Sequence, residues 1–503
     1  MSTGAFLEPL WQLTPKFVRD NSTQEFRWVE QRSTNDASNK NIRIVIDDIG
    51  SYLLFSEAHV QVDFTVSANA SIAETDGIAI PNAFALFDDI KLMVNNKIIP
   101  NCNRPGVVHH MVHSHLYSKD YAESIAETQM FYPLKKKDHA GVAISAPEYD
   151  DAHVAGYATN TTEYPFPVND PTAELQYYLT ANTTDNKYDL PATPRMRKNP
   201  KWDPVYARAV KRIADNIASD GKTPVAKDVS KCSVWLPLRE IYPMLGQAFN
   251  RVNRGSKFEV QLEKTATMER VFYTATAPSG LTFDITKASV WVPRLTPELE
   301  ASASIEAQIA SNTALVEPYE KYEHFSNPSI SAGTTTEQRY RVALQNSRVL
   351  RVYVGLQLDS QTSSFLRNPM QFESLGLQYI EARCNGNKYP LESYQTNSVG
   401  NAGKEGLVRM LRDVYATSNK TFDYENGSCI DFEGFVNGAQ RIYMLDMTQA
   451  DNSAWKKTGM SDLEIRYQCD GTASGVYTCH VVVVSEGEAK TNMLNGSMLL
   501  VQN

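Results

Sequence analysis

Strict alternation of apolar and polar side chains is the feature of this sequence that most restricts its fold. The alternation is complete at residues 59–66 and 257–263, and at 42–46 and 234–238 aliphatic residues recur at every second position with Val45, Trp235 and Pro237 among the residues between them. An extended strand with this period of two covers a core with one face and meets solvent with the other. The 25 Tyr and 19 Phe also favour strands over helices. We therefore expect an all-β protein whose sheets pack as sandwiches.

The length of the chain predicts more than one domain, because 503 residues exceed the size at which a single core stops growing. Periodic strands begin at residue 41, and strong periodicity disappears from about 127 to 230. A proline pair near 295 ends the last strand of the first half, since proline lacks the donor that a ladder needs. The expected parts are an N-terminal arm at 1–40 that frays or docks on a neighbour, a first jelly roll at 41–299 with a long loop insertion at about 127–230, a short helical linker at 300–313 and a second jelly roll at 314–503.

The second half repeats the plan of the first. Strands of similar pattern recur in the same order, and in each half one strand and its turn are followed by a short helix. A repeat that keeps both the order and the type of element indicates internal duplication. Two eight-stranded antiparallel jelly rolls in tandem, with short helices and long loops, match the number and length of the strands. The predicted pairs are 87–94 with 372–379, 109–117 with 407–415, 257–263 with 463–469, and 287–294 with 476–484.

Charge and cysteine usage restrict the partners. The formal net charge is −9 and the chain holds no block of five or six like charges. A protein that condenses nucleic acid carries a basic arm or stripe, so direct genome condensation and sequence-specific binding of nucleic acid are not expected. The six cysteines form no Cys-x-x-Cys pair and are expected to be reduced, mostly buried thiols. Neither a secretory signal nor a run of 18 apolar residues is found, so we expect no membrane span.

The histidines between His109 and His115 form the strongest candidate for a chemical site. His109 and His113 are four residues apart on a predicted helix and could share a metal ion. However, no His-Glu-x-x-His pattern is present and no third carboxylate ligand lies nearby in the sequence. Packing and surface histidines are the simpler interpretation, and a role in pH-dependent assembly lies between the two.

Five other motifs carry weaker signals. The Gly-Lys-Thr triplet at 221–223 lacks the first glycine of a phosphate loop and is followed by proline. The segment 471–475 is no nucleophile elbow, since a strand follows it, and a hairpin turn is expected instead. Paired acids at 88–89 and 150–151 are expected to be solvated loop carboxylates. The basic and aromatic patch at 195–212 could bind nucleic acid, although an acidic face of a neighbour is the commoner partner. The lysines at 135–137 are treated as surface charge.

One stretch resembles a known family. The sequence VWLPLREIYP at 234–243, the strand KFEVQLEK at 257–264 and SVWVPRLTP at 289–297 are similar to the end of the first jelly roll in double jelly-roll major capsid proteins. The resemblance is greatest to those of small eukaryotic double-stranded DNA viruses, namely Polinton-like viruses, adintoviruses and virophages. It covers the whole chain by length and layout, but its specific residues lie mainly in 232–299 and form a loose motif. The loops of the second half are shorter than in larger relatives.

This resemblance implies a structural role. Family members form homotrimers of pseudo-hexagonal outline that tile an icosahedral capsid around a double-stranded DNA genome, with a penton protein and minor capsid or cement proteins as further partners. The chain would be assembled in the host cell and reside in the virion, and the loops at 127–230 would form an outward tower and subunit contacts. We expect no enzyme activity and no catalytic, cofactor-binding or metal-binding residues.

Two alternative functions remain at this point. A carbohydrate-binding or carbohydrate-cleaving β-sandwich protein would show tryptophans clustered with carboxylates. A viral fibre or spike protein would show a shaft repeat of short period, and none is found. The tryptophans are scattered along the chain, at 11, 28, 202, 235, 291 and 455.

Overall fold

The fold was analysed in a computed structural model of the chain. The long insertion expected at about 127–230 lies outside the described residues, apart from its first and last few positions. The structure describes residues 23–48, 50–67, 78–95, 97–98, 102–122, 124–131, 229–250, 252–255, 257–274, 281–310, 314–344, 348–365, 367–384, 386–396, 404–417, 428–430, 435, 441–447, 462–492 and 498–501.

Two antiparallel sheets form the first sandwich. Sheet 1 has the order β1-β13-β4-β9, with β3 also pairing with β13 and β10 with β3, and sheet 2 has the order β2-β11-β6-β7, with β8 pairing with β6. A separate short pair joins β5 and β12. The strands are β1 Thr23–Arg32, β2 Asn41–Ile46, β3 Tyr52–Leu54, β4 His59–Ser67, β5 Ile78–Ala79, β6 Phe87–Val94, β7 Lys97–Ile98, β8 Cys102–Asn103, β9 Val229–Pro237, β10 Val252–Asn253, β11 Phe258–Lys264, β12 Tyr273–Thr274 and β13 Thr282–Pro297.

The second sandwich is built in the same way. Sheet 3 has the order β14-β21-β16-β19, with β22 pairing with β21, and sheet 4 has the order β15-β20-β17-β18. The strands are β14 Ala314–Ile330, β15 Gln338–Val342, β16 Arg348–Leu358, β17 Leu377–Cys384, β18 Asn387–Gln395, β19 Ile442–Asp446, β20 Leu463–Cys469, β21 Tyr477–Asn492 and β22 Met498–Val501.

The strand order shows that the two halves are copies of one plan. In each half the first, third, sixth and last of the eight main strands form one sheet, and the remaining four form the other. These strands are β1, β4, β9 and β13 in sheet 1 and β14, β16, β19 and β21 in sheet 3. This arrangement is the eight-stranded jelly roll. The predicted pairs β11 with β20 and β13 with β21 hold the same places in their sheets. The predicted double jelly roll is therefore confirmed.

Two details of the sequence prediction need correction. The stretch matched to β6 starts too early, because β17 begins at Leu377 and the preceding Leu375 and Gly376 have positive φ. Phe372 is buried outside the strand and so imitated a strand position. The first strand also begins before residue 41: β1 lies within the segment expected to be an arm and runs along β13.

Helices fill the connections between strands. The predicted short helices are confirmed as α2 and α11, which precede β9 and β19 in their respective halves, and α9 lies where the helical linker is expected. None of the helices in the described part of the chain is long and apolar enough to cross a membrane. The helices are α2 Pro105–Leu116, α3 Lys119–Ala122, α8 Pro243–Gly246, α9 Leu299–Ala310, α10 Asp359–Thr362 and α11 Lys404–Thr417, with 3-10 turns η1 Phe55–Glu57, η2 Ala83–Leu86, η3 Ile125–Gln129, η4 Leu238–Glu240 and η5 Met268–Arg270.

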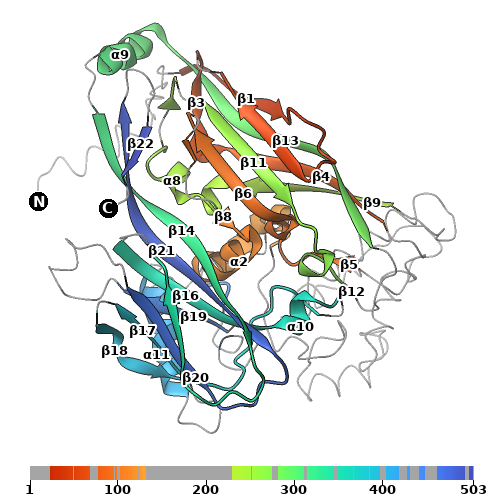
Figure 1. The fold of residues 1–503 in the computed structure, drawn as a ribbon. Coiled ribbons are helices and arrows are strands. Elements are labelled where there is room, and N and C mark those ends of the chain that lie inside the picture. The colour runs from red at the N-terminus through yellow and green to blue at the C-terminus, as the bar shows by residue number, and fades with distance from the viewer. Residues whose placement is uncertain are drawn as a thin grey trace, which may run out of the picture.

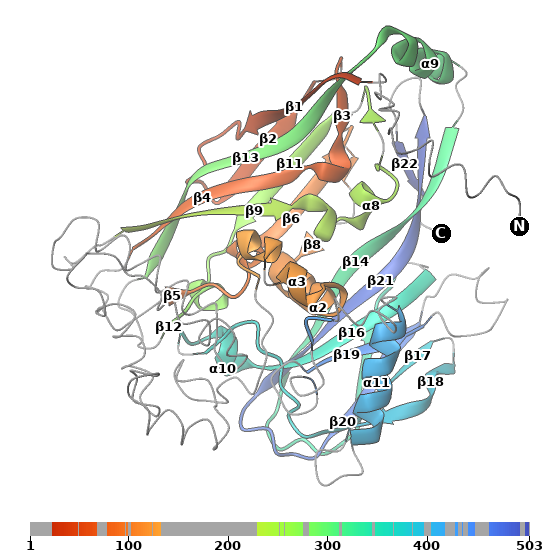
Figure 2. The same cartoon turned by 180° about the vertical axis from the view of Figure 1, so that it is seen from behind.

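Sheet 3 is the middle layer of the molecule. On β21, Val481 and Val483 belong to the core of the second sandwich, whereas Val482 and Val484 belong to the cluster that includes the core of the first. The run of four valines has no polar position because both of its faces are covered. Figures 1 and 2 show α2 and α8 lying between sheet 3 and the strands of the first sandwich. The two sandwiches therefore share one continuous apolar interface.

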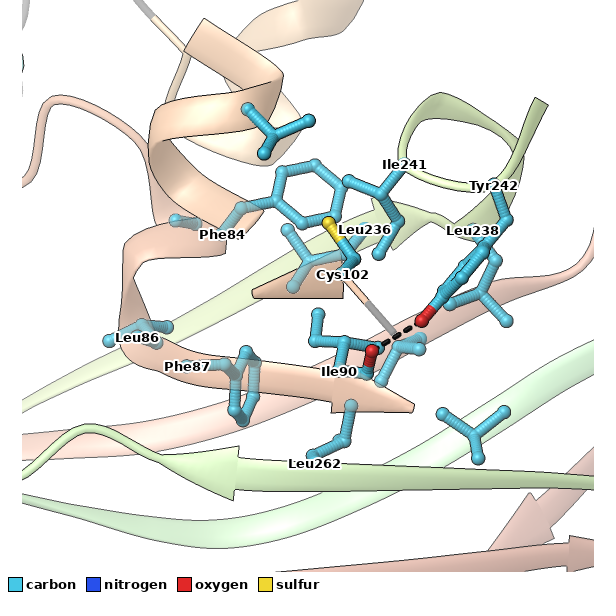
Figure 3. Close-up of a cluster of buried hydrophobic side chains, with 14 of the residues drawn as sticks. Phe84, Leu86, Phe87, Ile90, Cys102, Leu236, Leu238, Ile241, Tyr242 and Leu262 are labelled. Atoms are coloured by element: carbon cyan, nitrogen blue, oxygen red, sulfur yellow. Dashed lines mark hydrogen bonds between the residues drawn. The ribbon is translucent and has the colours of Figure 1, made fainter. Parts of the chain in front are cut away.

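The core of the first sandwich continues from the sheets into the connections (Figure 3). The buried ring of Tyr242 donates a hydrogen bond from its hydroxyl to the carbonyl oxygen of Ile90, so its polar atom is satisfied. The other labelled side chains of this cluster are Phe84, Leu86, Phe87, Cys102, Leu236, Leu238, Ile241 and Leu262.

The segment from Gly471 to Gly475 is not the hairpin turn that the sequence predicts. It connects β20 of sheet 4 to β21 of sheet 3, so it crosses from one sheet of the sandwich to the other. The strands β20 and β21 on either side suggested a hairpin, because the sequence pattern does not reveal which sheet a strand joins. All six cysteines are free thiols, and five of them are buried.

Candidate assembly surfaces

Helix α2 joins the two sandwiches. The Nε2 atom of His115 lies 3.1 Å from the carbonyl oxygen of Ile442 in β19. At the end of the helix the backbone N–H of Cys429 donates to the carbonyl oxygen of Tyr117 over 3.1 Å. Every residue of the helix from Pro105 to His115 is buried. The helix is thus an internal part of the interface between the halves.

The candidate histidines are bound within a buried network around Glu240. The side-chain amide of Asn82 donates to Nδ1 of His109, since its oxygen already accepts the N–H of Phe84. Nε2 of His109 therefore carries the proton and donates to the Glu240 carboxylate over 2.9 Å. Nε2 of His113 donates to the backbone oxygen of Glu240 over 2.7 Å. These contacts make the group structural.

The electrostatics of α2 favour neutral histidines. Burial lowers the pKa of His109 and His110 to about 3, and that of His113 to about 4. A metal ion would need lone pairs on these rings, but both nitrogens of His109 and Nε2 of His113 are taken by the protein. Within the described residues no three His, Cys, Asp or Glu side chains gather as a metal site would require.

An exposed aromatic surface lies on the outer side of sheet 1. It consists of Phe26 and Trp28 in β1, His59 in β4, Trp235 in β9 and Trp291 in β13, and we call it the aromatic face. Their ring centroids follow one another at 6.3, 4.9, 4.4 and 6.0 Å in the order Phe26, Trp28, His59, Trp235 and Trp291. Phe26, Trp28 and Trp235 are 54%, 43% and 36% exposed. Large rings left in water at neighbouring positions are typical of an interaction site.

The strand register explains how the aromatic face forms. Trp291 lies opposite His59 across the β13–β4 ladder, and Trp235 lies opposite Gln61 across the β4–β9 ladder. The indole N–H of Trp291 donates to the Gln61 side chain over 2.8 Å, which holds the ring against the sheet. These rings stand at the outward positions of strands whose inward positions, such as Val60 and Leu236, are buried. Figures 1 and 2 place these strands on the side of the molecule away from sheet 4.

The corresponding surface of the second sandwich is covered. Strands β14, β16, β19 and β21 of sheet 3 turn apolar residues toward the first half, including Tyr322, Tyr353, Met444 and Val482. All four are buried. Sheet 1 and sheet 3 occupy the same place in their jelly rolls. The outer face of sheet 3 is thus covered within the chain, whereas the outer face of sheet 1 is exposed.

A cavity of about 610 Å³ opens between the two halves. Arg104 and Arg270 line it from the first sandwich, and His324 and His480 from the second. The two imidazoles are 3.0 Å apart, Nε2 to Nδ1. Burial lowers the pKa of His324 to about 3. Glu269 and Asp359 also line the cavity, so its charges are mixed and do not select one sign of ligand.

The remaining sequence candidates do not gather into a site. Asp88 accepts from Thr265 over 2.9 Å and Asp89 pairs with Lys91 at 3.3 Å. The two acids are consecutive on β6 at an irregularity in its register with β11, and each is bound to a different partner. The acids at 150–151, the triplet at 221–223, the lysines at 135–137 and the basic patch at 195–212 lie outside the described residues.

The aromatic face is not evident from the spacing of the tryptophans. They are scattered along the chain, yet sheet 1 brings Trp28, Trp235 and Trp291 together. A signal was present in the alternation itself, because Trp235 stands at a position where the pattern demands a polar residue. A tryptophan at a solvent-facing position of a strand indicates a surface that a binding partner covers.

Comparison with known proteins finds likeness in structure alone. No family model matches the sequence, and no curated protein matches it. A chain in the cryo-EM structure of the Sputnik virophage superposes with a TM-score of 0.54 at 10% identity, covering 96% of this chain and 89% of that chain. The crystal structure of the mavirus major capsid protein gives a TM-score of 0.50 at 10% identity, covering 94% of this chain and 90% of that chain.

The fold and the comparisons agree on the class. The protein has the double jelly-roll architecture of viral major capsid proteins along nearly its whole length. Within that class, its structural likeness includes the virophages Sputnik and mavirus.

Proposed function

We propose that this protein is the major capsid protein of a double-stranded DNA virus, and that three copies assemble into a pseudo-hexagonal capsomer that tiles an icosahedral shell. The observation that carries the proposal is the tandem repeat of one eight-stranded plan. Three copies of a duplicated unit offer six nearly equal sides around a threefold axis, and such a block can tile a closed surface. Jelly rolls have short, protected edges, so they pack side by side without templating aggregation.

The finer parts of the proposal follow from this role. The chain acts by binding copies of itself and has no catalytic, cofactor-binding or metal-binding residues. A penton protein and minor capsid or cement proteins complete the shell, which forms in the host cell and is found in the virion. The lineage is that of Polinton-like viruses, adintoviruses and virophages. Residues 127–230 supply the outward tower, and the expected domain limits at 299 and 314 separate the two jelly rolls.

The aromatic face favours a second candidate function. Rings such as Trp28, His59 and Trp235 on one face of sheet 1 form a platform on which sugar rings could stack. A carbohydrate-binding sandwich protein would use this platform as its ligand site. A separate binding module gives no reason for the duplication, however, whereas a capsomer does.

Electron microscopy tests the proposed function. The full chain, purified and viewed in negative stain, is expected to show particles of hexagonal outline with threefold symmetry, and closed shells at high protein concentration. Single compact particles without symmetry at every concentration, together with binding to an oligosaccharide array, would support the carbohydrate function instead.

A further inference from the structure

We infer that the aromatic face is covered by a second copy of this chain, and that helix α11 of the second sandwich of that copy makes the contact. This inference rests on the proposed capsomer and names the two surfaces that hold it together. The occupant follows from the internal repeat of the chain.

The interface inside the chain shows how one sandwich covers the next. Helix α2, which follows β8 and precedes β9 in the sequence, covers the outer face of sheet 3. The side chain of His115 makes a hydrogen bond to Ile442, and its ring lies 5.4 Å from that of Tyr353. The helix that precedes β9 in one sandwich therefore closes the sheet of the next sandwich.

Helix α11 is the counterpart of α2 in the second sandwich. Helix α11 precedes β19 in the second sandwich, as α2 precedes β9 in the first. Within the chain, α2 of the first sandwich covers sheet 3 of the second. If the second sandwich meets the first sandwich of the next copy in the same way, α11 covers sheet 1 of that copy. The surface it meets is the aromatic face. Repeating one heterologous contact around an axis closes a ring when the rotations add up to a full turn, as a capsomer of three copies requires.

The two helices begin with similar sequences. Gly106-Val107-Val108 in α2 aligns with Gly406-Leu407-Val408 in α11. Both glycines pack too closely for a side chain: a Cβ on Gly106 would lie 2.7 Å from Ala85, and one on Gly406 would lie 1.9 Å from the Gln395 carbonyl oxygen. The two helices thus begin in the same way, each pressed against its own sandwich.

This alignment assigns the outer face of α11. Val108 and Val112 share a helical face with His115, which contacts sheet 3. Their counterparts are Val408, which is 46% exposed, and Arg412, which is also exposed. Whereas α2 is buried on all sides, α11 packs one face on β18 and β19 and leaves the other open (Figure 2).

The chemistry of the two surfaces is complementary. Tryptophan faces attract guanidinium groups, and Arg412 lies exposed on α11, whereas the neighbouring Arg409 already lies over the Tyr394 ring and pairs with Glu392. The ring edges of the aromatic face leave an apolar area that Val408 can fill. The contact is more polar than the one inside the chain, as expected of a surface that must stay soluble before assembly.

Two double variants test the inference. Variant A replaces the face (Trp28→Ser with Trp235→Ser), and variant B replaces the helix (Val408→Asp with Arg412→Asp). Tryptophan and arginine dominate such contacts, so each variant alone is expected to weaken association by about 100-fold and to be monomeric in light scattering. Val476→Ser, at a site 43% exposed outside both surfaces, is the control and is expected to assemble like the parent chain. Circular dichroism confirms that each variant is folded.

Mixing the variants makes the test specific. Variant A keeps the helix and variant B keeps the face, so one sound contact is left between them. An equimolar mixture is therefore expected to form a one-to-one pair near twice the 56.3 kDa subunit mass, and no ring. If variant B dimerises alone, the face pairs with itself and the inference is wrong. If both variants still assemble like the parent chain, these surfaces are not the contact, although the proposed capsomer stands. A monomeric parent chain would overturn both.

Discussion

The imidazole Nε2 of His115 lies 3.1 Å from the carbonyl oxygen of Ile442, so a side chain on the helix of the first sandwich is hydrogen-bonded to a strand of the second. Both groups are buried, and the surrounding apolar cluster is continuous with the core of the first sandwich. The two jelly rolls are therefore held as one body. This rigidity matters for a capsomer, because it sets the angle between neighbouring sides.

Replacing His115 with alanine is expected to loosen this body. The change leaves the Ile442 carbonyl without its side-chain partner and opens a gap beside Tyr353. The expected loss in the free energy of unfolding is about 2–4 kcal/mol. Urea unfolding at fixed protein concentration measures it. The control Val476→Ala, at a site 43% exposed outside both proposed contact surfaces, is expected to change stability by less than about 0.5 kcal/mol. An equal effect of both substitutions would contradict the account.

The glycines that begin the two helices are expected to be intolerant of side chains. Gly106→Ala places a methyl group 2.7 Å from the Ala85 backbone, and Gly406→Ala places one 1.9 Å from the Gln395 oxygen. Each is expected to lower the melting temperature clearly, with a cost of about 1–3 kcal/mol or more. Gly475→Ala is the matched control, since no atom lies within 4 Å of its added carbon. Tolerance at Gly406 would show that α11 is placed differently.

The buried histidines predict a loss of stability in acid. The folded-state pKa is about 3 for His109 and His110 and about 4 for His113, below the unfolded value near 6.5. Between pH 6.5 and 4 the unfolded chain binds more protons than the folded one, so stability falls as the pH falls. Each histidine contributes about 1.4 kcal/mol per pH unit in this window, which is roughly 2 kcal/mol at pH 5.

Urea unfolding at pH 7 and pH 5 checks this dependence. His110→Leu is the informative variant, because Nδ1 of His110 makes no hydrogen bond and its ring lies against Phe131 and Phe372. The free energy of unfolding of this variant is expected to depend less steeply on pH, by about 1.4 kcal/mol per pH unit, which is the share of one histidine. Equal stability of the parent chain at the two pH values would contradict the burial of these rings.

The cysteines are expected to resist alkylation. Burial raises the pKa of Cys384 and Cys479 to about 12 and that of Cys469 to about 11, so little thiolate exists at neutral pH. Mass spectrometry after a short exposure to iodoacetamide is expected to find Cys232, which is only partly buried, modified first. In urea all six thiols should react. Rapid labelling of Cys479 in the folded protein would show that sheet 3 is open.

Much of the fold could be predicted because alternation is a local property. The strands from Phe258 to Lys264 and from Leu463 to Cys469 follow from period two alone, and their equivalence follows from their order. Sheet membership could not be predicted, as the turn at Gly471 shows, since it depends on which distant strand supplies the ladder. The valines from 481 to 484 read simply as a buried strand, and only the structure shows that two different cores cover them.

The candidate surface was harder to foresee than the fold. The spacing of His109 and His113 is that of a metal pair, but Asn82 and Glu240, distant in the sequence, occupy both nitrogens of His109 and Nε2 of His113. The tryptophans at 28, 235 and 291 are the opposite case. They are far apart in the chain and do not look like a group, but they meet through the ladders of sheet 1. Tertiary contacts decide the meaning of both groups.

The mass of the purified full chain in solution tests the central claim most directly. Size-exclusion chromatography with light scattering is expected to give a stable species of three times the 56.3 kDa subunit mass, about 169 kDa, at micromolar concentration. A species that stays at 56.3 kDa at every concentration, with no larger assembly at low pH or high salt, would contradict the account.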